Sequence, residues 1–299
     1  MTNGTQTVTS PPRKKVTVAT LAAIKARGER AVFLTAYDYP TAAFADRAGV
    51  DMLLVGDSAA MTMLGLPSTV GITMREMLVF ARAVCRGAHR AFIVGDLPFL
   101  SYQTSDRSAI RNAGAFIAAG CDAVKCEGGA RVARRVRAMS DAGIAVMGHL
   151  GLTPQAIGQQ GGYRVQGKTL QAVEQLVDDA LALKEAGAFA VLLEAVPSAA
   201  AALIRERVDL LVFGIGAGMD VDGQLMISHD LLGNFVGDVN PRFARRYAHL
   251  DREIERAFRC YADDVRAGRF PAPEHCYPID PSDEANIRAA TATATVTDT

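Results

Sequence analysis

The amino-acid sequence predicts an α/β protein built as a (β/α)8 TIM barrel. Eight short apolar segments alternate with segments that have the length and pattern of helices. The alternation runs from residue 17 to residue 280 without a linker, as expected for one domain of this class. Most apolar segments also end in an ionisable residue, and the carboxyl ends of barrel strands meet at one rim. The alternative is a doubly wound open sheet, but the first strand–helix turn lacks the GxGxxG motif of its dinucleotide-binding form.

The strand predictions rest on apolar runs of five to seven residues. Runs of this length that are rich in valine, isoleucine, leucine and phenylalanine are typical of parallel strands buried on both faces. The eighth run gives the weakest strand pattern of the set. The expected strands cover residues 31–37, 51–56, 91–95, 122–126, 144–148, 189–193, 210–214 and 224–228.

Helices are expected where apolar residues recur at helical spacing between these strands. The first is a short amphipathic helix that begins at 17–24 and is capped by Thr17 or Thr20, and Ser105 caps a later helix. A long loop, 58–72, follows the second strand. The other expected helices cover residues 40–48, 73–86, 105–119, 130–141, 169–186, 198–206 and 250–267.

The composition favours a protein that acts on small molecules. The chain has 299 residues and a formal net charge of zero, so no overall field attracts nucleic acid or an acidic membrane. No apolar run approaches the roughly 20 residues that span a bilayer, and no targeting segment is recognisable. The five cysteines form no CxxC motif and no disulfide framework, which indicates reduced thiols in a cytoplasmic protein.

Three parts of the chain are expected. Residues 1–14 are rich in threonine, serine and proline and are predicted to be a disordered tail. Residues 15–283 are predicted to form a single catalytic barrel domain with a C-terminal helix. Residues 284–299 show no helical stripe and are predicted to be a frayed tail.

The segment Val124–Gly129 is the centre of the predicted site. Side chains of a strand alternate between its faces, so Lys125 and Glu127 point the same way. A cation and an anion on one face of a buried strand are costly unless that face lines a polar site. The alternative is an edge strand whose two charges are solvated.

Three carboxylates are expected to lie near one another at the rim. Asp57, Asp96 and Glu127 end the second, third and fourth strands, and neighbouring strands lie about 4.8 Å apart. Like charges at this spacing repel unless a cation neutralises them, and oxygen ligands suit Mg²⁺. The alternative is a metal-free salt-bridge network centred on Lys125.

Other strand ends carry further candidates. His149 ends the fifth strand and is either a structural histidine or a hydrogen-bond donor to a substrate carboxylate. Glu194 ends the sixth, where partial burial would raise its pKa and make it a usable base. Asp38 is as readily a helix cap as a site residue. The glycine turn 216–218 lies where many barrels bind phosphate, but a tight turn needs glycine in any case.

The motifs around these residues resemble those of the ketopantoate hydroxymethyltransferase (3-methyl-2-oxobutanoate hydroxymethyltransferase) family. The resemblance extends from about residue 17 to residue 280. The motifs, together with the segment around Glu194, are Thr35-Ala36-Tyr37-Asp38, Val55-Gly56-Asp57-Ser58, Gly95-Asp96-Leu97-Pro98-Phe99, Val124-Lys125-Cys126-Glu127-Gly128-Gly129, Gly148-His149-Leu150-Gly151-Leu152-Thr153-Pro154-Gln155, Gly161-Gly162-Tyr163-Arg164-Val165-Gln166-Gly167 and Gly214-Ile215-Gly216-Ala217-Gly218.

The resemblance implies a barrel of the phosphoenolpyruvate/pyruvate type. It implies transfer of a hydroxymethyl group from 5,10-methylenetetrahydrofolate to 3-methyl-2-oxobutanoate, through a Mg-stabilised enolate. The product would be 2-dehydropantoate (ketopantoate), which is used for pantothenate and coenzyme A. The resemblance also implies a homodecamer built as a pentamer of dimers.

The resemblance further assigns roles to the rim residues. It implies a Mg²⁺ site at Asp57 and Asp96, with Glu127 reached directly or through water. It implies a catalytic base at Glu194. The residues implied to bind the 2-oxo acid are Asp57, Ser58, Asp96, Lys125 and His149.

The chain departs from the family pattern at two places. The loop after the second strand reads Gly65-Leu66-Pro67-Ser68-Thr69, which bears on access of the folate, and the usual Ile-Pro before the seventh strand is replaced. Two rival functions remain open. One is a metal-dependent carbon–carbon lyase or aldolase that uses no folate, and the other is a binding or structural barrel without catalytic activity.

Overall fold

The computed structural model describes residues 14–237 and 241–294, with side chains through residue 291. The chain divides into two compact units, one ending at Ala248 and the other beginning at His249. The tail predicted at residues 1–14 lies almost entirely outside the described residues. Among those that are described, no helix has the length and hydropathy needed to cross a membrane.

The first unit is the predicted barrel. Eight parallel strands follow one another in chain order and close where the first pairs with the eighth, which excludes the open sheet. Each expected strand is present, with its ends shifted by a few residues. The strands are β1 (Ala31–Thr35), β2 (Met52–Val55), β3 (Phe92–Asp96), β4 (Ala123–Glu127), β5 (Val146–Gly151), β6 (Ala190–Glu194), β7 (Leu211–Ile215) and β8 (Gly223–Met226).

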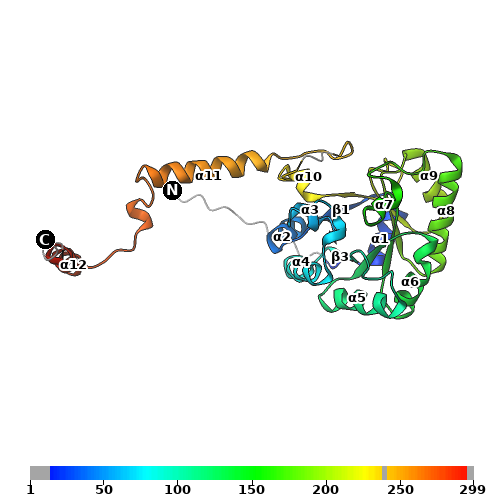
Figure 1. The fold of residues 1–299 in the computed structure, drawn as a ribbon, viewed down its shortest axis with the longest axis horizontal. Helices are drawn as coiled ribbons and strands as arrows, with labels where there is room; N and C mark the ends of the chain where they lie inside the picture. Colours follow the sequence, from blue (N-terminus) through cyan, green and yellow to red (C-terminus); the bar gives the residue numbers. More distant parts are fainter. Residues whose placement is uncertain (1–13, 238–240, 295–299) are drawn as a thin grey trace. The chain divides into compact units, whose positions relative to one another are not determined.

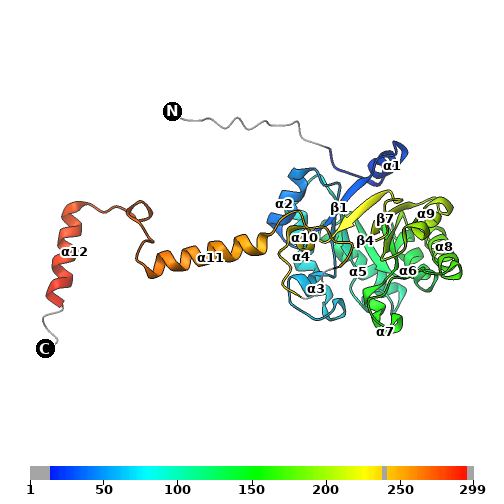
Figure 2. The ribbon, with the colours of Figure 1, turned by 90° about the horizontal axis from the view of Figure 1, so that it is seen from above.

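Helices surround the strands and follow one another around the barrel (Figures 1 and 2). Thr17 caps the first helix and Ser105 caps α5, as predicted, because each hydroxyl accepts a backbone N–H of the first turn. The helices are α1 (Val18–Ala26), α2 (Tyr39–Ala48), α3 (Ala59–Thr62), α4 (Met74–Gly87), α5 (Asp106–Ala118), α6 (Ala130–Asp141), α7 (Ile157–Gln160), α8 (Leu170–Glu185), α9 (Ser198–Arg207) and α10 (Ser228–Leu232). Two 3-10 turns, η1 (Thr69–Gly71) and η2 (Pro154–Ala156), lie in the loops after β2 and β5.

The core has two layers because successive strand residues face opposite sides. Met52 and Leu54 of β2 belong to the cluster inside the barrel, whereas Leu53 belongs to the cluster between strands and helices. Inside the barrel, the rings of Phe33 and Phe213 meet edge to face at 5.7 Å. Because apolar side chains fill the interior of the barrel, polar side chains gather at the carboxyl ends of the strands.

The second unit differs from the prediction at its end. It contains α11 (Leu250–Arg266), close to the expected helix, then η3 (Pro273–His275) and α12 (Pro281–Ala294). Residues 284–299 were expected to form a frayed tail, yet α12 occupies most of this stretch, and the expected boundary at residue 283 lies inside it. Along residues 281–291, where side chains are described, the helix has no buried stripe. It forms through local interactions, including the i,i+4 ion pair of Glu284 and Arg288 at 2.6 Å.

Candidate functional site

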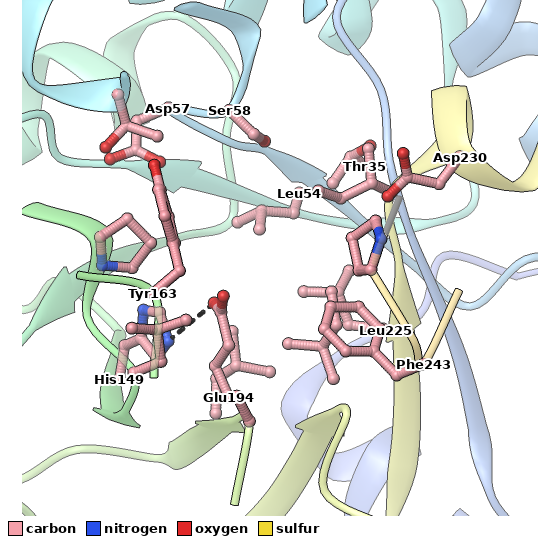
Figure 3. A pocket seen from close by; sticks show the side chains of 18 of the residues that line it. Thr35, Leu54, Asp57, Ser58, His149, Tyr163, Glu194, Leu225, Asp230 and Phe243 are labelled. Carbon is pink, nitrogen blue, oxygen red and sulfur yellow. Dashed lines mark ion pairs between the residues drawn. The ribbon is translucent and has the colours of Figure 1, made fainter. Parts of the chain in front are cut away.

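A cavity of about 350 Å³ opens at the carboxyl ends of the barrel strands (Figure 3). The residues to which the family resemblance assigns roles all line it, whereas Asp38 and the glycine turn 216–218 are not among its lining residues. The lining residues with assigned roles are Asp57, Ser58, Asp96, Lys125, Glu127, His149 and Glu194. The barrel brings them together because consecutive strands β2 to β6 each deliver their last residues to the same rim.

Lys125 lies at the centre of the charged cluster. Its Nζ is 2.9 Å from Asp96 Oδ1, 3.9 Å from Glu127 Oε1 and 3.2 Å from His149 Nδ1. Strand register explains these contacts, since Lys125 pairs with Asp96 of β3 and Glu127 pairs with His149 of β5. The Lys125 and Glu127 side chains are only 3% and 2% exposed, so the edge-strand interpretation is wrong. Burial alone would lower the pKa of Lys125, but Asp96, Glu127 and Asp57 raise it, which keeps the lysine charged.

Asp57 and Asp96 are adjacent, and their negative charges are only partly compensated by nearby cations. Asp96 Oδ2 accepts a hydrogen bond from the backbone N–H of Asp57 at 3.0 Å. Burial raises the pKa of Asp57 well above its ordinary value, and the charges of Asp96 and Glu127 raise it further. Burial also raises the pKa of Asp96, although Lys125 opposes that rise. Lys125 therefore compensates Asp96, whereas Asp57 has no ion-pair partner among the described residues.

His149 connects the cluster to Glu194. Its Nδ1 lies 3.4 Å from Glu127 Oε1, and its Nε2 lies 3.3 Å from Glu194 Oε2. Burial and Lys125 lower the pKa of His149, but the two glutamates outweigh them and raise it to about 9. The two ring nitrogens of His149 therefore face protein carboxylates, and Nδ1 also lies 3.2 Å from Lys125 Nζ. The sequence did not indicate that His149 would pair with the proposed base.

Glu194 is placed to reach the contents of the cavity. It ends β6, across the barrel from Asp57, which follows β2, and Figure 3 shows both carboxylates bordering the cavity. Its side chain is 18% exposed, more than that of His149. Among the described residues, His149 Nε2 has no partner in hydrogen-bond geometry. Its contact with Glu194 therefore does not fix the orientation of the Glu194 carboxylate.

The carboxylates fit an incomplete site for a hard cation. Within the described residues, no three histidine, cysteine or acidic side chains form a ready metal-binding group. Mg²⁺ takes few carboxylates and keeps several waters, so Asp57 and Asp96 suffice as direct protein ligands. Glu127 Oε1 is buried without a hydrogen-bond partner among the described residues. Three carboxylates, those of Asp57, Asp96 and Glu127, surround the single lysine Lys125, and this surplus of acidic groups suits a divalent cation.

Supporting residues were not predicted from the sequence. Gln155 donates to Asp57 Oδ2 through its side chain and to Glu127 Oε2 through its backbone, both at 2.9 Å. Tyr37 places its hydroxyl 2.8 Å from Ser58 Oγ. Both residues lie inside the sequence motifs given above. Their place in these motifs was the sequence feature that could have identified them. Asp38, by contrast, accepts the backbone N–H of Thr41 at 2.7 Å and is a helix cap.

The wall across the cavity from His149 is mostly apolar. Leu54, Leu225 and Phe243 border it in Figure 3, where Thr35 and Asp230 lie on the same side. Leu192 and Ile215 also line the cavity. Phe243 lies over the glycine turn 216–218, and a Cβ added at Gly216 would be 2.6 Å from its ring. Glycine is therefore needed there for close packing. The cavity thus has a charged floor beside an apolar wall.

Two further cations lie on the cavity lining. Arg164 belongs to the loop after β5 and Arg242 to the segment after α10. Both side chains are exposed. The cavity therefore combines a negative interior with cationic groups in the loops.

Comparisons with known proteins agree over most of the chain. A relative from Moorella thermoacetica, named 3-methyl-2-oxobutanoate hydroxymethyltransferase, is 51% identical over 266 residues, which are 89% of this chain and 98% of the relative. A relative of the same name from Syntrophobacter fumaroxidans is 50% identical over 265 residues, with 88% of this chain and 93% of the relative covered.

Solved structures share the fold at low identity. Phosphoenolpyruvate phosphomutase from Streptomyces platensis subsp. rosaceus matches with a TM-score of 0.58 and 16% identity, covering 93% of this chain and 97% of that chain. The lyase acting on 2,3-dimethylmalate, described as a PEP mutase/isocitrate lyase superfamily member, matches with a TM-score of 0.56 and 16% identity, covering 93% and 96%. These similarities agree with the closed eight-stranded barrel and concern the fold alone. The model of one family, ketopantoate hydroxymethyltransferase, matches residues 15–273, and this chain belongs to that family.

Proposed function

We propose that this protein transfers a hydroxymethyl group from 5,10-methylenetetrahydrofolate to 3-methyl-2-oxobutanoate and forms 2-dehydropantoate. The observation that carries the proposal is the continuous set of strand-end charges from Asp57 to Glu194 in a chain of this family. The set provides acidic ligands, a buried cation and a separate carboxylate around one cavity.

The metal in this proposal is Mg²⁺, held by Asp57 and Asp96 with Glu127 in direct contact or behind a water. When bound, Mg²⁺ supplies Lewis-acid polarisation of the keto oxygen of the substrate. The raised pKa values of both aspartates and the excess negative charge support a cation at this position.

The protein's own groups then bind and deprotonate the oxo acid. Lys125 is a buried, charged donor that attracts the substrate's anionic end, and Ser58 offers a hydroxyl on the cavity lining. Glu194 accepts the proton from C3, and His149, whose Nε2 lies 3.3 Å from Glu194 Oε2, stands beside the base and orients it. C3 forms a bond to the one-carbon unit, water supplies the hydroxyl oxygen, and tetrahydrofolate leaves.

The folate is proposed to occupy the apolar side of the cavity. Phe243 provides aromatic surface for its ring system on this side, and Tyr163 lines the cavity on the side of Asp57 and His149 (Figure 3). Arg164 and Arg242 are positive groups near the carboxylates of its glutamate end. The atypical loop 65–69 ends at Thr69, which lines the cavity, so we expect the sequence of this loop to affect folate affinity.

One assay tests the function. The purified protein is incubated with the oxo acid, the folate and Mg²⁺, and the product is detected by mass. Formation of 2-dehydropantoate that requires the folate supports the proposal. Turnover of an oxo acid without the folate would indicate the lyase or aldolase alternative. No Mg²⁺-dependent turnover of any kind would indicate a binding or structural barrel.

We also propose that the protein is a homodecamer, a pentamer of dimers, located in the cytoplasm. Family membership supports the assembly, and the reduced cysteines Cys85 and Cys121 are compatible with the location. Light scattering at micromolar protein concentration measures the mass directly. A mass of about ten chains is expected, and a monomeric mass would contradict the assembly.

A further inference from the structure

We propose that Gln155 is a positioning residue that holds Asp57 and Glu127 in the orientation that binds the metal. This inference rests on the Mg²⁺ site of the proposed function. Gln155 is 6% exposed and comes from η2, outside the barrel strands. It lines the neighbouring cavity behind the carboxylates, so its influence on the site passes through the groups that it contacts.

Gln155 contacts the two carboxylates with different donors. Its side-chain Nε2 donates to Asp57 Oδ2 at 2.9 Å, and its backbone N–H donates to Glu127 Oε2 at 2.9 Å. A single residue therefore links the end of β2 to the end of β4, across the strand that carries Asp96. If Gln155 moves, both carboxylates lose a donor together.

The surrounding hydrogen bonds determine which way the amide points. Nε2 also donates to the carbonyl oxygen of Leu97 at 2.9 Å, so both of its protons are used. Oε1 lies 3.0 Å from the hydroxyl of Tyr102, which accepts the backbone N–H of Glu127 at 2.9 Å. Reversing the amide would place its oxygen against the Asp57 carboxylate and the Leu97 carbonyl. Both contacts would then be repulsive.

This arrangement decides which oxygens remain for a cation. Gln155 engages Asp57 Oδ2 and Glu127 Oε2, which leaves Asp57 Oδ1 and Glu127 Oε1 without a contact to Gln155. Glu127 Oε1 faces His149 Nδ1 at 3.4 Å and Lys125 Nζ at 3.9 Å, and it is one of the buried oxygens that have no partner in hydrogen-bond geometry among the described residues. An amide donor fixes the carboxylates without adding charge to a site that already has an excess of carboxylates. Groups that orient metal ligands in this way typically change metal affinity 10–100-fold when removed.

The test compares Gln155→Met with a matched control in the same loop. Methionine keeps the length of the side chain and removes its amide. Gln160 also makes two hydrogen bonds through its side chain, to the backbone N–H of Thr153 at 3.1 Å and the carbonyl of Gly151 at 3.0 Å, but it hydrogen-bonds to no carboxylate within the described part of the chain. Gln160→Met therefore measures the cost of loosening the loop alone.

Mg²⁺ alone is titrated into each metal-free protein by calorimetry, and thermal unfolding confirms that the variants are folded. We expect Gln155→Met to bind Mg²⁺ roughly 10–100-fold more weakly than the parent, with Gln160→Met close to the parent. In turnover assays the loss should appear as a raised Mg²⁺ requirement, and kcat should recover substantially at saturating Mg²⁺.

Tyr102→Phe provides a second, milder variant, because it removes the hydroxyl that orients the amide and leaves the amide itself. A smaller loss of Mg²⁺ affinity is expected. Equal Mg²⁺ affinity in the parent, Gln155→Met and Tyr102→Phe would overturn the positioning role while leaving the proposed function intact. An equal loss in Gln160→Met would also overturn it, since a loose loop would then be the cause. If the parent itself binds no Mg²⁺, the metal of the proposed function fails, and this role fails with it.

Discussion

Replacing Lys125 with methionine tests the electrostatics of the cavity floor. Methionine has a similar length and no charge, so the change removes a buried cation from among Asp96, Glu127 and Asp57. Breaking a buried ion pair by deleting one partner costs about 3–5 kcal/mol, because the remaining charge is uncompensated. With a shift of about 2–4 °C for each kcal/mol, the melting temperature falls by roughly 6–20 °C.

The loss of stability in Lys125→Met should increase as the pH rises. Lys125 lowers the pKa of both Asp57 and Asp96, so its removal raises their folded-state pKa values further above the ordinary carboxyl value. The folded protein then binds more protons than the unfolded chain, and its stability falls as pH rises through the raised pKa. The deficit of Lys125→Met is therefore smaller at pH 5 than at pH 8.

Thermal unfolding of metal-free protein across this pH range is the assay. Lys184→Met is the control, because Lys184 pairs with Asp209 at 3.7 Å on the surface and such pairs contribute little. A deficit that is the same at both ends of the pH range, or no larger than that of the control, would refute the assignment of Lys125 as the central counter-charge. Binding of 3-methyl-2-oxobutanoate should also weaken strongly in Lys125→Met.

Two further predictions concern the metal and the far end of the barrel. Asp57→Ala or Asp96→Ala should abolish Mg²⁺-dependent binding of the oxo acid while leaving the fold intact; calorimetry showing unchanged binding in both variants would exclude these residues as ligands. Asp222→Ala should cost about 3–5 kcal/mol of stability with little change in kcat, because this buried carboxylate pairs with Lys25 at 3.1 Å and accepts the N–H of Val212 at 2.9 Å, before β8 begins. An unchanged melting temperature would contradict that role.

The fold could be predicted because the barrel strands are short apolar runs in a regular order. Strand ends were less certain, since they depend on pairing with neighbours. β5 was expected to end at Gly148 but continues to Gly151, because it stays paired with β6 as far as Glu194. Helix α12 was not predicted because its described side chains form no buried apolar stripe. Such a stripe was the sequence pattern from which the other helices were predicted.

The rim residues could be predicted because topology alone brings parallel strand ends together. The same reasoning could not identify Gln155 or Tyr102, which lie in loops. Which groups a loop side chain contacts depends on the three-dimensional path of the loop, and no spacing rule indicates it. The partner of His149 was missed for a related reason. Its pairing with Glu194 depends on side-chain conformation across β5 and β6.

Exchange of the C3 proton of 3-methyl-2-oxobutanoate in D₂O with Mg²⁺ present tests the central claim most directly, because it needs no folate. Glu194→Gln keeps the shape of the side chain and removes the proton acceptor. General-base catalysis contributes about 10²–10⁴-fold, so exchange by the variant should slow by that factor while oxo-acid binding is nearly retained. If the variant exchanges the proton as fast as the parent, Glu194 is not the base.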